Sequence, residues 1–203
     1  MPDLQTPHYL IDLARLRVNM ERIQTLRQQS GAKCLLALKC FATWSVFDLM
    51  QQYMDGTTSS SLYELKLGRQ KFAGETHAYS VAWADDEIEE MVANCDKIIF
   101  NSIGQLERFA EATEGTIRGL RVNPQVSSSD YLLADPARPF SRLGEHDPAK
   151  IEAMITRLAA TTRPTTAPGE DAGVSARTHA RVLVVPVRAG VSAPTARAVS
   201  RVR

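Results

Sequence analysis

A lysine at the end of an apolar run is the residue of this chain whose position most suggests chemistry. The run Leu35–Leu38 ends at Lys39, shortly before a helical pattern that can begin at Thr43. A continuous apolar run followed by a helix is typical of a covered strand in a parallel sheet. Alternation along the strand puts Leu35, Ala37 and Lys39 on one face, so the lysine is expected to continue a buried face.

A lysine in that position has two interpretations. Burial disfavours the charged form of an ammonium group, and a free amine is the nucleophile that attacks an aldehyde to form a Schiff base. On this interpretation Lys39 is the candidate nucleophile. The alternative is an ordinary strand-end lysine, with its stem on apolar surface and its charged end in water.

Ser61 and Glu64 are a second candidate pair, because they stand where a polar stretch enters a helix. Their spacing is that of a capping box, in which each side chain accepts a hydrogen bond from a backbone amide near the other. Capping alone would explain both residues. The functional alternative is that small hydroxyl side chains at a helix entrance let a flat ligand approach and offer it hydrogen bonds.

Arg121 is the third candidate and lies in an expected strand over 117–124. It shares a strand face with Gly119 and Asn123. If that face points inward, a buried cation needs an anionic partner. The alternative is an ordinary ion pair with a neighbouring acid.

The elements that position these residues alternate between strands and helices. Thr6–Asp12 resembles a short strand, and Asp12 can cap the helix that follows it. Beyond that helix, apolar runs and turn residues predict strands at 33–41, 77–83, 97–101 and 117–124, and a polar strand or loop at 55–61, each followed by a helix or by a loop that leads into one. This order predicts an α/β fold with a parallel sheet.

Composition places the chain among globular proteins. It has 203 residues, 44% of them hydrophobic, and a net charge of +1 that favours neither nucleic acid nor membrane as a partner. The three cysteines are odd in number and show no metal-ligand spacing, which predicts reduced, structural thiols and a cytoplasmic location. We expect no bound metal ion and no membrane span.

The composition changes near residue 158. Residues 1–157 carry a net charge of −4, whereas residues 158–203 carry +5, hold no aromatic residue and consist largely of Arg, Ala, Val, Thr and Pro. Such a composition cannot cover a core, so we expect a disordered or frameshifted segment. A genuine low-complexity basic tail is the alternative. Only 181–187 resembles a strand, and Pro186 restricts it to a sheet edge.

Five motifs fall at expected strand ends or loops. They are Thr-Pro-His-Tyr-Leu-Ile-Asp at 6–12, Leu-Leu-Ala-Leu-Lys-Cys-Phe at 35–41, Gly-Thr-Thr-Ser-Ser-Ser-Leu-Tyr-Glu at 56–64, Leu-Arg-Val-Asn-Pro at 120–124 and Leu-Ala-Asp-Pro-Ala-Arg-Pro-Phe-Ser-Arg-Leu-Gly at 133–144. Through these motifs, residues 1–157 resemble the carboxynorspermidine (carboxyspermidine) decarboxylase family, which uses pyridoxal 5'-phosphate on an alanine racemase-like barrel. Such a barrel builds its site at strand ends and loops.

The resemblance implies a partial (β/α)8 barrel of the TIM type whose C-terminal β-domain is missing from this chain. Lys39 would carry the cofactor as an imine, and Ser61, Glu64 and Arg121 would be cofactor-binding residues. Thr58 departs from the aspartate that better-known basic-amino-acid decarboxylases of this fold have at about this place. That departure favours the carboxynorspermidine branch.

The implied function is decarboxylation of the small molecules carboxynorspermidine or carboxyspermidine in polyamine biosynthesis, by an enzyme that is a homodimer at full length. The family's phosphate-binding loop and ring-nitrogen acid would lie beyond residue 157, so we expect a weakly active or inactive chain. The alternatives are a single-domain cofactor-binding protein, a non-catalytic decarboxylase-like regulator and an alanine racemase-like enzyme. The motifs at 120–144 argue against the racemase.

Overall fold

The computed structural model describes residues 7–126, 131–161 and 182–186, and it arranges them as a six-stranded parallel sheet with helices packed against one face. The strands are β1 (Leu35–Ala37), β2 (Gly56–Ser59), β3 (Glu75–Tyr79), β4 (Lys97–Phe100), β5 (Ile117–Val122) and β6 (Val182–Pro186). The α-helices are α1 (Leu13–Ser30), α2 (Phe47–Met50), α3 (Leu62–Lys71), α4 (Ile88–Asn94), α5 (Ile103–Arg108) and α6 (Pro148–Thr161). Two short 3-10 turns are η1 (Trp44–Val46) and η2 (Leu132–Ala134).

Helix starts are determined locally by capping side chains. An Asp12 carboxylate oxygen accepts hydrogen bonds from the backbone amides of Ala14 and Arg15, at 2.9 and 3.1 Å, so the expected cap is confirmed. The Ser102 hydroxyl caps α5 in the same way. At α6, Asp147 caps a helix whose first residue is Pro148, because proline has no N–H that needs a partner there.

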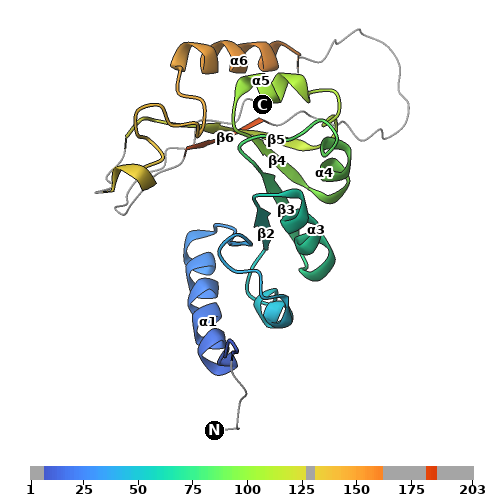
Figure 1. Ribbon diagram of the computed structural model, residues 1–203, viewed down its shortest axis with the longest axis vertical. Coiled ribbons are helices and arrows are strands. Elements are labelled where there is room, and N and C mark those ends of the chain that lie inside the picture. The colour runs from blue at the N-terminus through green and yellow to red at the C-terminus, as the bar shows by residue number, and fades with distance from the viewer. Residues whose placement is uncertain (1–6, 127–130, 162–181, 187–203) are drawn as a thin grey trace.

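The strands follow one another across the sheet in the order of the sequence, and every neighbouring pair is parallel (Figure 1). Parallel neighbours need a crossover connection, and helices α2 to α5 supply one between each of the first five strands. The strands predicted between residues 33 and 124 are therefore confirmed, and the stretch 55–61, predicted as a strand or a loop, contains β2. The strands are shorter than predicted, and β3 begins at Glu75, before its predicted start. Because all strands run the same way, their carboxyl ends meet at one edge.

The two faces of the sheet differ in burial. Residues that face the helices are buried, for example Leu36, Thr57 and Thr76, which lie side by side on neighbouring strands. The adjacent row on the opposite face holds Ala37, Thr58, His77 and Lys97, and all four are only half-buried. In a closed barrel this second face would be the interior, so the described strands leave the prospective interior partly open to solvent.

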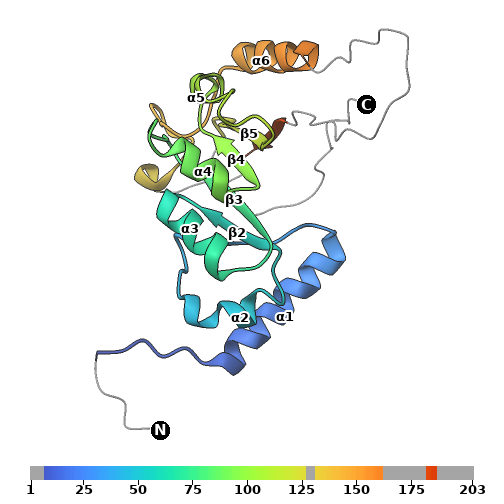
Figure 2. The same cartoon turned by 90° about the vertical axis from the view of Figure 1, so that its right-hand side faces the viewer.

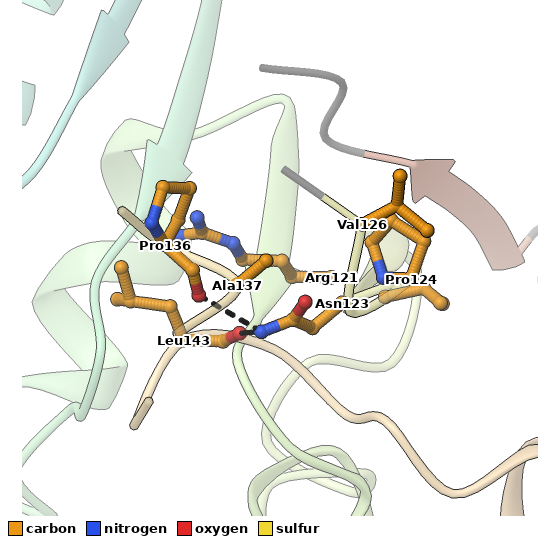
Figure 3. Close-up of a pocket in the computed structure, with 8 residues that line it drawn as sticks. Arg121, Asn123, Pro124, Val126, Pro136, Ala137 and Leu143 are labelled. Atoms are coloured by element: carbon orange, nitrogen blue, oxygen red, sulfur yellow. Dashed lines mark hydrogen bonds between the residues drawn. The ribbon is translucent and has the colours of Figure 1, made fainter. Parts of the chain in front are cut away.

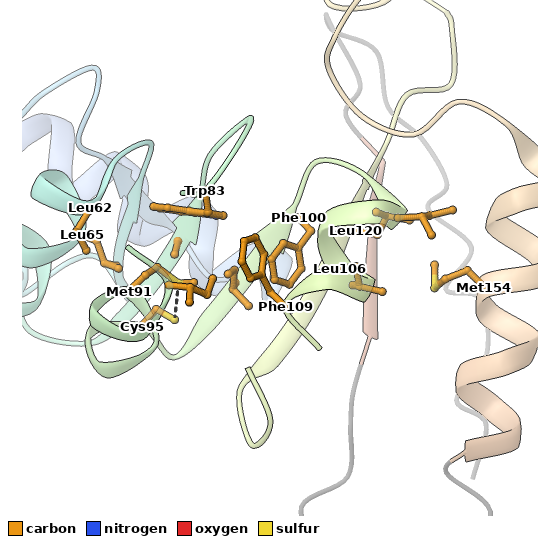
Figure 4. Close-up of a cluster of buried hydrophobic side chains, with 14 residues drawn as sticks. Leu62, Leu65, Trp83, Met91, Cys95, Phe100, Leu106, Phe109, Leu120 and Met154 are labelled. Atoms are coloured by element: carbon orange, nitrogen blue, oxygen red, sulfur yellow. Dashed lines mark hydrogen bonds between the residues drawn. The ribbon is translucent and has the colours of Figure 1, made fainter. Parts of the chain in front are cut away.

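Two apolar clusters hold the helices to the sheet. The larger one joins α3, α4, α5 and α6 to strands β3 to β5, and in it the rings of Phe100 and Phe109 stack with centroids 6.2 Å apart (Figure 4). The smaller one joins α1 and α2 to β1, around the edge-to-face pair Phe47 and Phe72. Trp83 also lies in the larger cluster.

One expectation about the chain ends is wrong, α6 extends across the expected boundary, and the strand predicted within 181–187 is present at the sheet edge. Residues 7–12 form no strand, because no neighbouring strand pairs with them in the described part of the chain. Helix α6 runs past the expected boundary at 157 to Thr161, and α1 and α6 lie at opposite ends of the molecule (Figures 1 and 2). Within the segment expected to be disordered, β6 pairs with β5 at the sheet edge, the position to which Pro186 restricts it. The rest of that segment, 162–181 and 187–203, lies outside the described residues.

The described residues also bear on thiols, metals and membranes. Cys34, Cys40 and Cys95 are free thiols, and burial raises the pKa of Cys95 to about 12, as expected of an inert structural cysteine. No group of three or more His, Cys, Asp and Glu side chains gathers as a metal-ligand set within the described ranges. Across the same ranges, none of the helices is both long and apolar enough to cross a membrane.

Candidate functional site

The carboxyl edge of the sheet is the candidate site, because parallel α/β sheets bind ligands where their strands end. Lys39 follows β1, Ser61 follows β2, and Arg121 lies near the end of β5. Strands β1 and β5 are four strand spacings apart, about 19 Å in a flat sheet. The sheet must therefore curl, as in a barrel, for Lys39 and Arg121 to contact one small ligand.

Lys39 lies at this edge but not in the environment that the strand pattern predicts. Strand β1 ends at Ala37, whose carbonyl accepts hydrogen bonds from the amides of Cys40 (3.0 Å) and Phe41 (3.2 Å), so Lys39 is in a turn. Its side chain is exposed, and it contacts no hydrogen-bond or ion-pair partner in the described part of the chain. The expectation of a buried Lys39 is wrong here, because the described strands do not close over the inner face.

Ser61 and Glu64 form the helix cap that their spacing predicts. The Ser61 hydroxyl accepts a hydrogen bond from the Glu64 amide at 3.3 Å, and a Glu64 carboxylate oxygen accepts one from the Ser60 amide at 2.6 Å. The hydrogen bond to the Glu64 carboxylate therefore comes from Ser60, the residue before the N-cap residue Ser61. Both side chains are half-buried at the start of α3, directly after β2. Their geometry is explained by capping, and it also holds the carboxyl end of β2 in place.

Arg121 is half-buried on the inner face and has an aromatic partner. Its guanidinium group donates a hydrogen bond to the Tyr79 hydroxyl and lies over the Tyr79 ring, with Cζ 5.3 Å from the ring centroid. No carboxylate pairs with Arg121 within the part of the chain that the structure describes. The expected ion pair with a neighbouring acid is therefore not what holds this side chain.

Tyr79 and Asn101 are site residues that the sequence patterns did not single out. The Tyr79 hydroxyl donates to the Asn101 side-chain carbonyl at 3.1 Å, and Asn101 directly follows β4. A polar residue just after an apolar strand was the available indication for Asn101, because the carboxyl ends of barrel strands carry functional side chains. Tyr79 gave no such indication, since aromatic residues are common in strands.

The segment 135–145 packs against the ends of β4 and β5. The Asn123 side-chain amide donates to the carbonyls of Pro136 and Leu143, both at 2.9 Å (Figure 3). Glu145 exchanges backbone hydrogen bonds with Arg121 (2.8 Å) and Asn123 (2.7 Å), which adds a short bridge to β5. The hollow left between Arg121, Asn123 and this segment is about 10 Å³, room for about one water.

A second charged cluster lies at the opposite, amino end of the inner face, around Glu75. Its carboxylate pairs with Lys33 and with Lys97 (2.8 Å) and hydrogen bonds to His77 (2.9 Å). The bond from Lys33, helped by those from Lys97 and His77, lowers the pKa of Glu75 to about 2. Burial lowers the pKa of His77, against the opposing effect of Glu75. This cluster is remote from the carboxyl edge and stabilises the strands there.

The arrangement of strands and helices is similar to that of solved decarboxylases. Among solved structures, the carboxynorspermidine decarboxylase from Campylobacter jejuni complexed with norspermidine matches with a TM-score of 0.63 and 36% sequence identity. The match covers 70% of this chain and 36% of that chain. The described parallel sheet with its helices therefore resembles part of that decarboxylase structure.

Curated relatives point to particular decarboxylases. The chain is 67% identical over 155 residues to the carboxynorspermidine/carboxyspermidine decarboxylase of Herminiimonas arsenicoxydans, covering 76% of this chain and 42% of the relative. It is 31% identical over 146 residues to the carboxyaminopropylagmatine decarboxylase of Synechocystis, covering 71% of this chain and 38% of the relative. These matches confirm the resemblance stated from the motifs. The chain spans about two fifths of the length of these relatives, and a scan of protein-family models finds no match.

Proposed function

We propose that this chain takes part in the pyridoxal 5'-phosphate-dependent decarboxylation of carboxynorspermidine or carboxyspermidine, with Lys39 as the residue that attaches the cofactor. The observation that carries the proposal is the place of Lys39, exposed in the turn after β1 at the carboxyl edge of a parallel sheet. The similarity to named polyamine-type decarboxylases supports the choice of substrate class.

The side chains at this edge fit pyridoxal phosphate in two respects. An unpaired primary amine at Lys39 suits the aldehyde, and a guanidinium group without a described acidic partner at Arg121 suits an oxyanion. Ser61 and Glu64 satisfy the amides at the start of α3 and so hold the edge beside β2. When bound, the cofactor supplies an electron sink for the pair released as carbon dioxide leaves the substrate.

The protein's own contribution is to bind and orient. Lys39 would fix one end of the cofactor through its amine. Arg121, held on the Tyr79 ring, would fix an anionic group of the cofactor or of the substrate. The segment 135–145 narrows the space at the end of β5 and so limits access of water to Arg121. A cytoplasmic homodimer, which the resemblance implies, stays a prediction.

Labelling tests the attachment site. The chain is incubated with pyridoxal phosphate, reduced with borohydride and mapped by peptide mass spectrometry. We expect the label on Lys39, because Lys33 and Lys66 are paired with Glu75 and Glu90. The Lys39→Arg variant should lose the label while Lys33→Arg keeps it. Labelling of Lys33 or Lys66 in place of Lys39 would contradict the assignment.

Carbon dioxide release tests the reaction. The chain and its Lys39→Ala variant are compared on carboxynorspermidine, carboxyspermidine and carboxyaminopropylagmatine, each with pyridoxal phosphate present. Because the sequence predicts a weakly active or inactive chain, we expect at most weak release on the first two substrates, and any release should exceed that of the variant. Cofactor labelling of Lys39 without any release would show that the chain binds the cofactor but does not decarboxylate. Equal release above background by the two proteins would show that Lys39 has no part in the reaction.

A further inference from the structure

Asn101 joins three segments at the carboxyl edge of the sheet. Its side chain is 7% exposed. The side-chain carbonyl accepts hydrogen bonds from the Tyr79 hydroxyl (3.1 Å) and the Gly144 amide (2.9 Å), and the side-chain amide donates to the Arg142 carbonyl (2.7 Å). These contacts link the ends of β3 and β4 to the segment 135–145.

The contact with Tyr79 determines how Arg121 is held. A tyrosine hydroxyl has one proton, and here that proton is donated to Asn101. The hydroxyl oxygen therefore turns its lone pairs toward Arg121, whose guanidinium group donates to it and also lies over the ring. The three side chains form a chain of contacts from the segment 135–145 to the guanidinium group.

Every described partner of Arg121 in this arrangement is neutral. The Tyr79 ring and hydroxyl and the Asn101 amide orient the guanidinium group without neutralising its charge. The positive charge of Arg121 is thus kept for an anionic ligand. An aspartate at position 101 could still accept from Tyr79 and Gly144, but it would put a carboxylate one hydroxyl group away from Arg121.

Gly144 makes this arrangement dependent on the segment 135–145. Its φ of +83° is in the left-handed region that favours glycine, and a Cβ there would lie 3.0 Å from the Asn123 amide and 3.1 Å from Arg121 Cγ. Gly144 therefore allows the segment to lie directly against the stem of Arg121. The same residue donates its amide to Asn101.

We propose that Asn101 and Tyr79 are positioning residues that orient Arg121 and preserve its charge for an oxyanion, either the cofactor phosphate or a carboxylate of the substrate. The identity of the ligand rests on the proposed function, whereas the oxyanion site itself rests on the contacts of Arg121. A purely structural role of Asn101 predicts that any destabilising substitution weakens oxyanion binding, whereas this positioning role predicts a large loss only where a negative charge is added.

The experiment follows the Arg121 Nε–H signal of the isotope-labelled full chain by NMR during titration with inorganic phosphate, with Arg121→Lys used for assignment. Wild-type Arg121 should respond. Asn101→Leu removes three hydrogen bonds and no charge, so we expect phosphate affinity to fall about threefold or less. Asn101→Asp keeps the two hydrogen bonds that the side-chain oxygen accepts, replaces the amide donor to the Arg142 carbonyl with an oxygen and adds a charge, so we expect affinity to fall about tenfold or more.

Stability separates the two roles. Both substitutions leave the Arg142 carbonyl without its donor and should lower the urea concentration at the unfolding midpoint, because Asn101→Leu also removes the acceptor of Tyr79 and Gly144 and Asn101→Asp buries a charge. A purely structural role predicts that phosphate affinity falls in both variants, whereas the positioning role predicts the large loss of affinity in Asn101→Asp alone. The Asn94→Asp variant, which adds the same charge at the end of α4, controls for net charge and should bind phosphate as wild type does. Tyr79→Phe removes the hydroxyl but keeps the ring, and it should weaken phosphate binding less than Asn101→Asp.

The outcomes distinguish this inference from the proposed function. No response of wild-type Arg121 to phosphate, or equal phosphate affinity in wild type and Asn101→Asp, would overturn the inference even if Lys39 is labelled. Conversely, phosphate binding with the expected ranking would support it even if Lys39 is not labelled. Repeating the titration with pyridoxal phosphate and with pyridoxal separates the ligands, since only the former carries the phosphate. A ranking effect on pyridoxal phosphate and none on pyridoxal assigns the cofactor phosphate to Arg121, whereas the same ranking in a titration with acetate, and none with pyridoxal phosphate, assigns the carboxylate.

Discussion

Substitution of Glu75 by Gln should make the free energy of unfolding of this protein change less with pH in the acid range. The Glu75 carboxylate contacts Lys33, His77 and Lys97 at the amino end of the inner face, and these contacts lower its pKa from 4.5 to about 2. A group whose pKa is depressed in the folded state stabilises it above the unfolded pKa. That stabilisation is lost as the pH falls from about 4.5 toward about 2.

The magnitude follows from the size of the shift and from solvent exposure. A shift of this size corresponds to at most about 3 kcal/mol. The Glu75 side chain is 27% exposed and that of Lys33 is 60% exposed, so screening reduces the value to about 1–2 kcal/mol. The Glu75→Gln variant should therefore have a free energy of unfolding lower by about 1–2 kcal/mol at neutral pH.

Urea unfolding followed by tryptophan fluorescence measures this difference at neutral pH and again near pH 3. We expect the gap between wild type and Glu75→Gln to narrow at the lower pH, because near pH 3 the Glu75 carboxylate binds a proton in the unfolded state but stays largely ionised in the folded state, so unfolding takes up a proton. Glu111→Gln, at an exposed acid, is the matched control and should change stability by no more than about 0.5 kcal/mol. A gap of the same size at both pH values, or none at neutral pH, would refute the electrostatic explanation.

Two further predictions concern packing and capping. Phe100 has a fully buried ring stacked on Phe109, so Phe100→Ala should lower the free energy of unfolding, measured in urea, by about 3–5 kcal/mol. Tyr63 is 83% exposed, and the control variant Tyr63→Ala should lower it by about 0.5 kcal/mol or less. Similar losses in the two variants would show that Phe100 is not part of the core. Ser61→Ala should lose about 0.5–2 kcal/mol of stability with cofactor affinity unchanged, and Ser61→Thr should restore the stability. Loss of cofactor affinity in Ser61→Ala, measured by absorbance, would show that Ser61 also contacts the ligand.

Much of the fold was predictable because its causes are local. Strands β1 and β4 lie in short apolar runs, and the burial patterns of β1, β3 and β4 follow the alternation of side chains along a strand. The caps at Asp12, Ser61 and Ser102 depend on atoms within three residues of one another. Spacing along the chain therefore determined where helices begin, and the strand–helix order determined that the sheet is parallel.

The environment of the candidate site depended on tertiary structure. Lys39 is exposed because burial of a strand end requires strands that close over it, which the run Leu35–Leu38 cannot provide. Arg121 is held by Tyr79, 42 residues earlier in the chain, and Asn101 accepts from Gly144, 43 residues later. The sequence by itself determined that a lysine, a cap and an arginine follow strands at one edge. Which side chains meet there depends on how the strands are registered and curled, because contacts between residues far apart in the chain leave no periodic pattern in the sequence.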